Sequence, residues 1–161
     1  MLPALTPQGR LPVGRHEASL QEVRERFVDQ APHQDRRQLL FSALTLYADA
    51  VRQLVPEARL WIDGGFVTLK PEPPDDIDVV IVSYVPPTLT DEQLAPLLTL
   101  QGVTSTDPPI ALNRLQPVAG MIDGFFAAAH IPEVLAYWDD FWSKVKGAPD
   151  TERKGYVEVR L

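Results

Sequence analysis

The clearest hydrophobic pattern of the chain lies between Gln34 and Leu54. Apolar residues recur there at alternating steps of four and three, which is the spacing of one face of an α-helix. The residues of this stripe are Leu40, Leu44, Tyr47, Val51 and Leu54. Pro56 follows shortly afterwards, and proline cannot continue a helix. The pattern therefore predicts a helix over residues 34–54.

Shorter helices are indicated by their first residues. Ser19 stands three residues before Glu22, and Thr90 three residues before Gln93, which is the spacing of a capping box. Proline is favoured at the first position of a helix, and "PEVLAYWDDFWSKVKG" begins with one and ends near a glycine. The helices expected from these signals span residues 19–29, 91–100 and 132–147, and a further short helix is expected over 108–116.

The strand signals centre on "IDVVIVSYV", residues 77–85, which is apolar at consecutive positions. Such a run is typical of a strand covered on both faces, so we expect it in the middle of a sheet. "RLWIDGGFV", residues 59–67, reads as a neighbouring strand broken by a glycine pair. Further strands are expected over 118–128 and 154–161. Residues 1–18, with three prolines and two glycines, are expected to form an extended arm without regular pairing.

The mixture of strands and helices predicts an α/β (α+β) fold, and 161 residues are the size of one ordinary domain. We expect residues 1–161 to form a single domain with a small mixed β-sheet. Helices should pack on one face of that sheet, with carboxylates at the edge of the other.

Charge and composition exclude several classes of function. The net charge is −7 and no segment concentrates Lys and Arg, so we expect no broad surface for duplex nucleic acid. Because there is no Cys, a disulfide scaffold and any Cys-based metal site are excluded. The first residues lack the pattern of a signal peptide, and no apolar stretch approaches the length of a membrane span. We therefore expect a soluble cytoplasmic protein without membrane contact.

Two aspartates at the start of the central strand carry the strongest functional signal. Asp76 and Asp78 are two residues apart, and side chains of a strand alternate between faces, so both carboxylates should project to the same side. Like charges there need solvent, a cation or a proton to offset their repulsion. Hard oxygen ligands of this kind suit Mg²⁺ or Mn²⁺. Solvated carboxylates at a loop-to-strand junction are the alternative.

A glycine pair precedes these aspartates. Gly64 and Gly65 end a strand in a turn without side chains, where backbone N–H groups could approach a phosphate closely. A glycine pair, ten residues, and then Asp76, Ile77 and Asp78 before a β-branched strand resembles the nucleotidyltransferase signature of the DNA polymerase beta superfamily. The longer stretch "LWIDGGFVTLKPEPPDDIDVVIV", together with "KG" before the last strand, also resembles small bacterial and phage proteins of uncharacterised function with a minimal nucleotidyltransferase-like fold.

This resemblance implies a site and a reaction. Family members usually add a third carboxylate from a later strand, for which Asp123 is the candidate, and a turn aspartate is the alternative. The triad would bind two Mg²⁺ or Mn²⁺ ions. The substrate would be a nucleoside triphosphate, expected to be ATP, whose nucleoside monophosphate passes to a hydroxyl of a protein, an RNA or a small molecule. The chain departs from many minimal members, which have Ser where Gly65 stands.

Phosphate-binding residues are less clearly indicated. The basic candidates are Lys70, Arg36, Arg37, Arg153 and Lys154, with solvated surface as the alternative for the arginines at 36 and 37 and for Lys154. Asp63 could add a further charge, although a strand-end aspartate is commoner. The aromatic residues Tyr137, Trp138, Phe141 and Trp142 are expected to pack against the sheet, with base stacking or a partner interface as the alternative. His16, His33 and His130 share no metal-ligand spacing.

Two other functions stay open from the sequence. One is a nucleotidyltransferase-like binding module with reduced catalysis, such as an antitoxin or a phage-defence component. The other is a structural domain in which the acidic cluster is coincidental.

Overall fold

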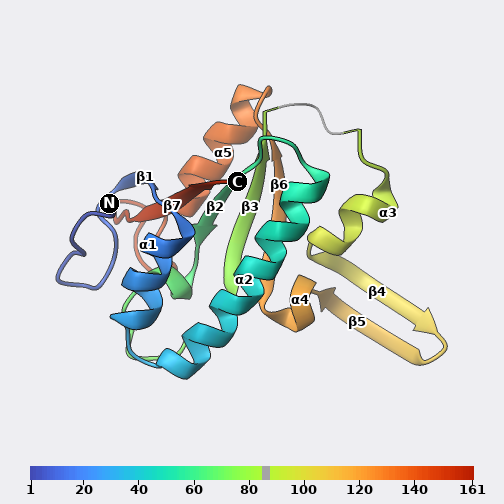
Figure 1. Cartoon of the computed structure of the whole chain (residues 1–161), viewed down its shortest axis with the longest axis horizontal. Coiled ribbons are helices and arrows are strands. Elements are labelled where there is room, and N and C mark those ends of the chain that lie inside the picture. Colours follow the sequence, from blue (N-terminus) through green and yellow to red (C-terminus); the bar gives the residue numbers. More distant parts are fainter. Residues whose placement is uncertain (85–87) are drawn as a thin grey trace.

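The computed structural model describes residues 1–84 and 88–161, and its centre is a mixed sheet (Figure 1). The strand order is β1-β7-β2-β3-β6. Strand β3 pairs antiparallel with β2 and parallel with β6, and β7 pairs antiparallel with β2 and parallel with β1. The strands are β1 (Gly14–Glu17), β2 (Arg59–Asp63), β3 (Ile77–Ser83), β6 (Ile122–Ala128) and β7 (Gly155–Arg160). The predicted α/β class and the predicted pairing of β2 with β3 are confirmed.

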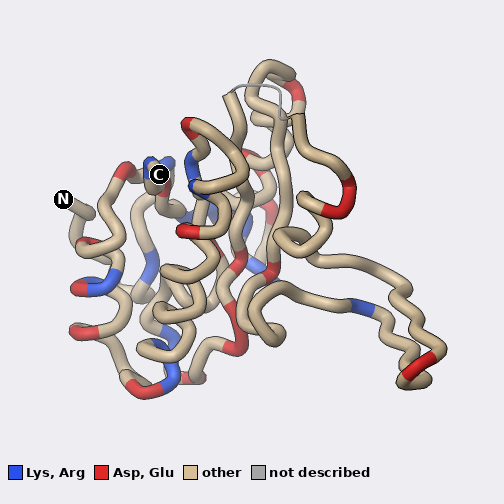
Figure 2. The backbone as a smooth tube through the Cα atoms, turned by 45° about the vertical axis from the view of Figure 1, so that its right-hand side comes forward, with Lys and Arg blue, Asp and Glu red and all other residues tan. Residues whose placement is uncertain are grey.

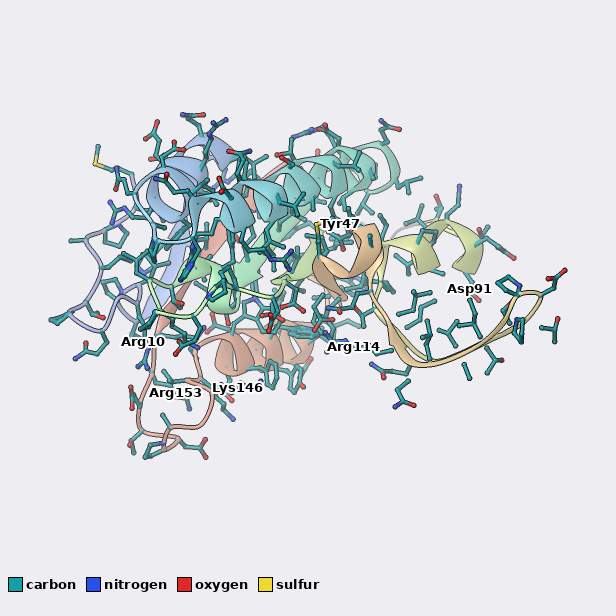
Figure 3. The ribbon with its side chains drawn as sticks, turned by 90° about the horizontal axis from the view of Figure 1, so that it is seen from below. Arg10, Tyr47, Asp91, Arg114, Lys146 and Arg153 are labelled. Atoms are coloured by element: carbon teal, nitrogen blue, oxygen red, sulfur yellow. The ribbon has the colours of Figure 1, made fainter. Side chains whose placement is uncertain are left out.

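The helices lie on both faces of this sheet, seen from below in Figure 3. They are α1 (Leu20–Arg24), which continues as a π-helical turn over Glu25–Asp29, α2 (Gln34–Leu54), α3 (Asp91–Leu94), α4 (Pro117–Gly120) and α5 (Pro132–Trp142). None of the helices among the described residues is long and apolar enough to cross a membrane.

Alternation along the strands explains why both faces are covered. Ile62, Val79 and Ile81 pack with the buried residues of α2, whereas Trp61 and Val80 pack with Trp142 and other residues of α5. Successive side chains of a strand point to opposite faces, and these strands are apolar at consecutive positions. The expectation that helices pack on one face only is therefore wrong for α5.

The N-terminal arm is also more ordered than expected. Strand β1 forms at Gly14–Glu17 and pairs with β7, and Arg10 bridges to Thr68. Leu2 and Leu11 are buried in the core on the α2 side. Prolines in residues 1–18 prevent regular pairing only locally, and the buried leucines hold the arm against the sheet edge.

Several predicted segments end elsewhere. The helix over 91–100 stops early, because α3 ends at Leu94 and a 3₁₀ turn covers Ala95–Leu97. The strand over 118–128 begins only at Ile122, after α4, and the helix over 132–147 ends at Trp142. The strand over 59–67 ends at Asp63 and becomes a 3₁₀ turn, η2 (Gly65–Val67). The expected end of the central strand, Val85, lies outside the described residues.

The structure differs most from the sequence-based expectation at residues 100–115, which form a β-hairpin. Strands β4 (Leu100–Thr106) and β5 (Pro109–Leu115) pair with each other in a separate two-stranded sheet. A helix over 108–116 was expected, but β-branched residues such as Val103 and Thr104 favour a strand, and β5 is their partner. The hairpin projects away from the central sheet (Figure 1), and every residue of β5 is exposed.

Candidate functional site

Three aspartates lie side by side across three neighbouring strands. Asp78 on β3 stands opposite Asp63 on β2 and opposite Asp123 on β6. Two residues further along each strand, Trp61, Val80 and Phe125 pack on the α5 side of the sheet. Because residues i and i+2 share a face, the three carboxylates also lie on that side, just beyond the aromatic residues. The prediction that Asp123 joins the aspartate pair is supported by this register.

Asp76 lies immediately before β3 and adds a fourth carboxylate. Its Oδ2 accepts a hydrogen bond from Gln116 Nε2 at 2.7 Å. Arg114 Nη2, at the base of the hairpin, is 3.2 Å from the same oxygen and 3.6 Å from Asp123 Oδ2. A guanidinium group therefore bridges two of the predicted metal ligands.

The Asp78 carboxylate differs from its neighbours because it is unpaired. Among the described residues, no hydrogen bond or ion pair joins it to a donor. Burial, and then the charges of Asp76, Asp63 and Asp123, raise the pKa of Asp78 to about 7. A carboxylate in this position lacks a counter-ion.

Asp123 is oriented by the segment that leads into the hairpin. Thr99 Oγ1 donates to Asp123 Oδ1 at 2.6 Å and accepts from the Gly124 backbone N–H at 3.0 Å. A side chain on Gly124 would overlap the Leu97 carbonyl oxygen, so this position needs glycine for the segment to pack against β6. Gly124 thus lets the Thr99 segment lie beside Asp123.

Asp63 forms a buried ion pair with Lys154. The Lys154 ammonium contacts Asp63 Oδ1 and also donates to the Trp142 carbonyl oxygen at 3.0 Å. Both residues are buried. Burial raises the pKa of Asp63 to about 6, and Lys154 opposes that rise. Lys154 is thus neither solvated surface nor a free phosphate ligand.

The glycine turn fits around Asp78. Gly64 has φ 82° and ψ −165°, a region essentially restricted to glycine. A methyl group on Gly64 would overlap Asp78 Oδ2 and lie 2.9 Å from its Cγ. Beside Gly65 the nearest atom to an added methyl group would be Pro74 Cβ at 3.7 Å. The first glycine is therefore required by the carboxylate, whereas the second position has room.

Arg37 supports the turn from behind. It is fully buried and donates to the carbonyl oxygens of Phe66 at 2.6 Å, Thr68 at 2.7 Å and Phe27 at 3.0 Å. Both interpretations of Arg37 from the sequence, a solvated residue or a phosphate ligand, are therefore wrong. Its guanidinium fixes the η2 turn instead.

The other basic candidates divide into two groups. Arg36 donates to the carbonyl oxygens of Pro74 and Asp75, and Arg153 pairs with Asp140. Neither arginine pairs with a carboxylate of the acidic row, which is formed by Asp63, Asp78 and Asp123 together with the adjacent Asp76. Lys70 does line the same cleft as the aspartates. Of these three residues, only Lys70 is in the lining of that cleft, and its role as a phosphate ligand stays a prediction.

The site lies in an open cleft of about 890 Å³. Asp63, Asp76, Asp78 and Asp123 form one part of its lining, with Gly64 and Gly65 beside them. Arg10, Lys70, Lys144 and Lys146 form a basic part of the lining, whereas the lining residues Arg114 and Lys154 pair with the aspartates. A polyanion bound through cations could contact both parts.

The aromatic helix α5 closes one side of the cleft. Trp142 is buried and packs with Trp61, as predicted, whereas Tyr137 and Phe141 are 58% and 49% exposed. Their rings stack 5.9 Å apart, and Phe141 lines the cleft.

His16 and His33 contact the carbonyl oxygens of Pro12 and Pro71, respectively.

The residues that sequence reasoning missed are Thr99, Arg114 and Gln116. Arg114 and Gln116 lay within the expected helix over 108–116. The donor set of the cleft, hard carboxylate oxygens, fits Mg²⁺ or Mn²⁺. Within residues 1–84 and 88–161, however, no three His, Cys, Asp or Glu side chains converge as they would around a metal ion. The Arg114 guanidinium lies between Asp76 and Asp123 instead.

Comparisons with known proteins place the chain in a family. Searches of curated proteins and of solved structures gave no match. Residues 3–160 match the family described as "Family of unknown function (DUF6932)", and the chain belongs to this family.

Proposed function

We propose that this protein is a metal-dependent nucleotidyltransferase, which transfers a nucleoside monophosphate from a nucleoside triphosphate to a hydroxyl group. The observation that carries the proposal is the unpaired carboxylate of Asp78, next to Asp123 and close to Asp76, on the floor of a cleft beside a glycine turn. Cations or protons must offset the repulsion in such an array of carboxylates, and a cation–triphosphate complex would supply cations.

The sheet supports the assignment of roles to the aspartates. Asp76, Asp78 and Asp123 come from one strand entrance and two paired strands. They would hold the divalent ions once their side chains turn toward one another, because among the described residues they do not converge as they would around a metal ion. Bound divalent ions would lower the pKa of the attacking hydroxyl and neutralise charge on the leaving pyrophosphate. Asp63 is paired with Lys154 and therefore has a supporting place at the end of the row.

The rest of the cleft suits the remainder of a nucleotide. Lys70, with Arg10, Lys144 and Lys146, offers positive charge to the phosphates. The exposed ring of Phe141 offers a flat apolar surface to a base. A volume of about 890 Å³ lies within the range of small-molecule sites.

In the proposed reaction the acceptor oxygen bonds to the α-phosphorus. The bond between that phosphorus and the oxygen bridging to the β-phosphate breaks, pyrophosphate leaves, and the hydroxyl proton is lost to the medium. The protein residues position the two reactants, which is the main contribution of an enzyme to phosphoryl transfer.

A second candidate is a binding module with reduced catalysis. Two observations favour it: Arg114 bridges Asp76 and Asp123, and the hairpin exposes Ile110, Leu112 and Leu115. Exposed apolar side chains on a projecting hairpin suit contact with another macromolecule.

The test offers α-labelled nucleoside triphosphates with Mg²⁺ or Mn²⁺ to the purified protein in cell lysate. We expect wild-type protein to transfer label to an acceptor and Asp78→Asn to lose the transfer by at least about 100-fold. The matched control is Asp49→Asn, which changes an exposed aspartate on α2 and should retain the transfer of label. Transfer that survives Asp78→Asn, or no transfer by the wild type with any nucleotide, would overturn the catalytic proposal. Binding of nucleotide without transfer would favour the binding module.

A further inference from the structure

Arg114 occupies a distinctive place in the cleft. Its Nη2 atom lies between two carboxylates from different strands, 3.2 Å from Asp76 Oδ2 and 3.6 Å from Asp123 Oδ2. It is the only charged residue within the sequence of β4 and β5. Figure 2 shows the hairpin with one basic position along it and an acidic position near its tip. In Figure 3 Arg114 lies at the base of the hairpin, beside the central sheet.

The guanidinium offsets part of the charge of the acidic row. Lys154 is bound to Asp63 at one end of the row, and Arg114 bridges Asp123 and Asp76 at the other. Like charges at neighbouring strand positions repel, so the cation lowers the cost of holding these carboxylates together.

Arg114 is nevertheless accessible to solvent. Its side chain is 44% exposed, and it lies on β5, every residue of which is exposed. Asp76 does not depend on Arg114 for its orientation, because Gln116 Nε2 donates to the same oxygen at the shorter distance of 2.7 Å. The arginine can therefore leave while a neutral donor keeps Asp76 in place.

We propose that Arg114 is an internal counter-ion that must leave Asp76 and Asp123 when a divalent ion binds, and that it then pairs with a phosphate of the nucleotide. This inference rests on the proposed function. A guanidinium group matches phosphate in a bidentate manner, and Arg114 lines the same cleft as Lys70. Metal alone must displace a cation without giving it a new partner, whereas metal with nucleotide supplies that partner. Metal and nucleotide therefore bind cooperatively.

The experiment measures Mn²⁺ affinity by the electron paramagnetic resonance signal of free Mn²⁺ at pH 8. Each protein is titrated alone and with a nucleoside triphosphate analogue that carries a methylene group between the α- and β-phosphates. For the wild type we expect the analogue to tighten Mn²⁺ binding about tenfold or more. For Arg114→Gln we expect Mn²⁺ alone to bind about tenfold more tightly than to the wild type. In the Arg114→Gln variant the analogue should tighten Mn²⁺ binding by less than about threefold.

Two further variants sharpen the result. Arg153→Gln removes the same charge from an arginine that pairs with Asp140 outside the acidic row, and it should behave as the wild type does. Arg114→Lys keeps the positive charge but lacks the planar guanidinium group that binds phosphate in a bidentate manner. This variant should therefore bind Mn²⁺ alone as weakly as the wild type does, and the analogue should tighten its Mn²⁺ binding less than in the wild type. Thermal unfolding of each variant verifies that it is folded, and we expect at most a small decrease in melting temperature for Arg114→Gln, which loses the cation that offsets part of the carboxylate repulsion.

The outcomes separate this inference from the proposed function. If Arg114→Gln binds Mn²⁺ no more tightly than the wild type, or keeps the full effect of the analogue, Arg114 is not the counter-ion, while nucleotide binding still stands. If neither protein binds Mn²⁺ with the analogue, both the inference and the proposed function fail.

Discussion

Gly64 and Asp78 lie so close that no other residue fits at position 64 without moving the carboxylate. A methyl group there would overlap Asp78 Oδ2, and the backbone of Gly64 has φ 82°. The glycine and the aspartate are 14 positions apart in the sequence, yet they form one unit of the site. The glycine at position 64 thus has a steric reason.

Substitution of the two glycines should have different effects. Gly64→Ala should lower the free energy of unfolding by about 1–3 kcal/mol, since it combines a disfavoured backbone with a clash. It should also weaken Mn²⁺ binding, because Asp78 must move. Gly65→Ala and Gly65→Ser have room at 3.7 Å from Pro74 and should change stability by less than about 1 kcal/mol. Urea unfolding of the three variants, combined with Mn²⁺ titration, measures both effects; equal losses at positions 64 and 65 would contradict the steric argument.

Removal of the charge at Asp78 should stabilise the metal-free protein. The pKa of Asp78 is raised from 3.8 to about 7, so between these pH values the folded state holds a proton that the unfolded chain has lost. The free energy of unfolding therefore decreases as pH rises through this window, and the loss is complete above pH 7. Asp63, with its pKa raised to about 6, adds a loss of the same sign at lower pH.

Asp78→Asn should accordingly raise the melting temperature at pH 8 by about 5 °C and flatten its dependence on pH between 5 and 8. Asp49→Asn, on the exposed surface of α2, serves as the control. Thermal unfolding followed by circular dichroism at several pH values gives the comparison. A lower melting temperature for Asp78→Asn at pH 8 would show that this carboxylate has a stabilising partner in solution.

The ion pair between Asp63 and Lys154 should be sensitive to loss of one partner. Lys154→Met leaves a buried carboxylate without its cation and should cost about 3 kcal/mol. The double variant Asp63→Asn, Lys154→Met should recover most of this loss, because no charge is then buried alone. Lys146→Met, an exposed lysine of the same cleft, is the control. Chemical unfolding provides the measurement, and additive losses in the double variant would contradict a direct interaction.

Arg37 should matter for stability far more than its neighbour Arg36. Arg37→Met leaves buried carbonyl oxygens of Phe27, Phe66 and Thr68 without a donor and should cost about 3–5 kcal/mol. Arg36→Met removes partly exposed contacts and should cost about 1 kcal/mol. Unfolding of both variants in urea tests the difference; similar costs would mean that Arg37 does not fix the turn.

The sequence allowed the central elements to be predicted because their signals are local. The stripe from Leu40 to Leu54 and the β-branched run after Asp78 each contain their own periodicity, and α2 and β3 formed as expected. The face of the sheet to which Asp78 points could be predicted for the same reason, because it follows from the alternation of side chains along the strand. Asp123 could be named because an apolar strand signal surrounds it.

The missed features depend on residues far apart in the sequence. Strand β1 exists because it pairs with β7, and the hairpin strand β5 because it pairs with β4. Asp63 and Lys154 are separated by 91 positions. Arg114 gave no signal in a segment expected to be helical, and its contact with Asp76 becomes visible only once the hairpin is placed. Local patterns contain no information about such partners.

The row formed by Asp63, Asp78 and Asp123 has a consequence for how the sheet assembles. A slip of β3 by one residue against its neighbours would turn its side chains over, which moves Asp78 into the apolar layer beneath α2 and exposes Val79 to the cleft. An ionised carboxylate in that layer would cost several kcal/mol. The aspartates that we assign to the site would therefore also favour correct strand alignment while the chain folds, and a variant with apolar residues in their place would lose this discrimination between alignments.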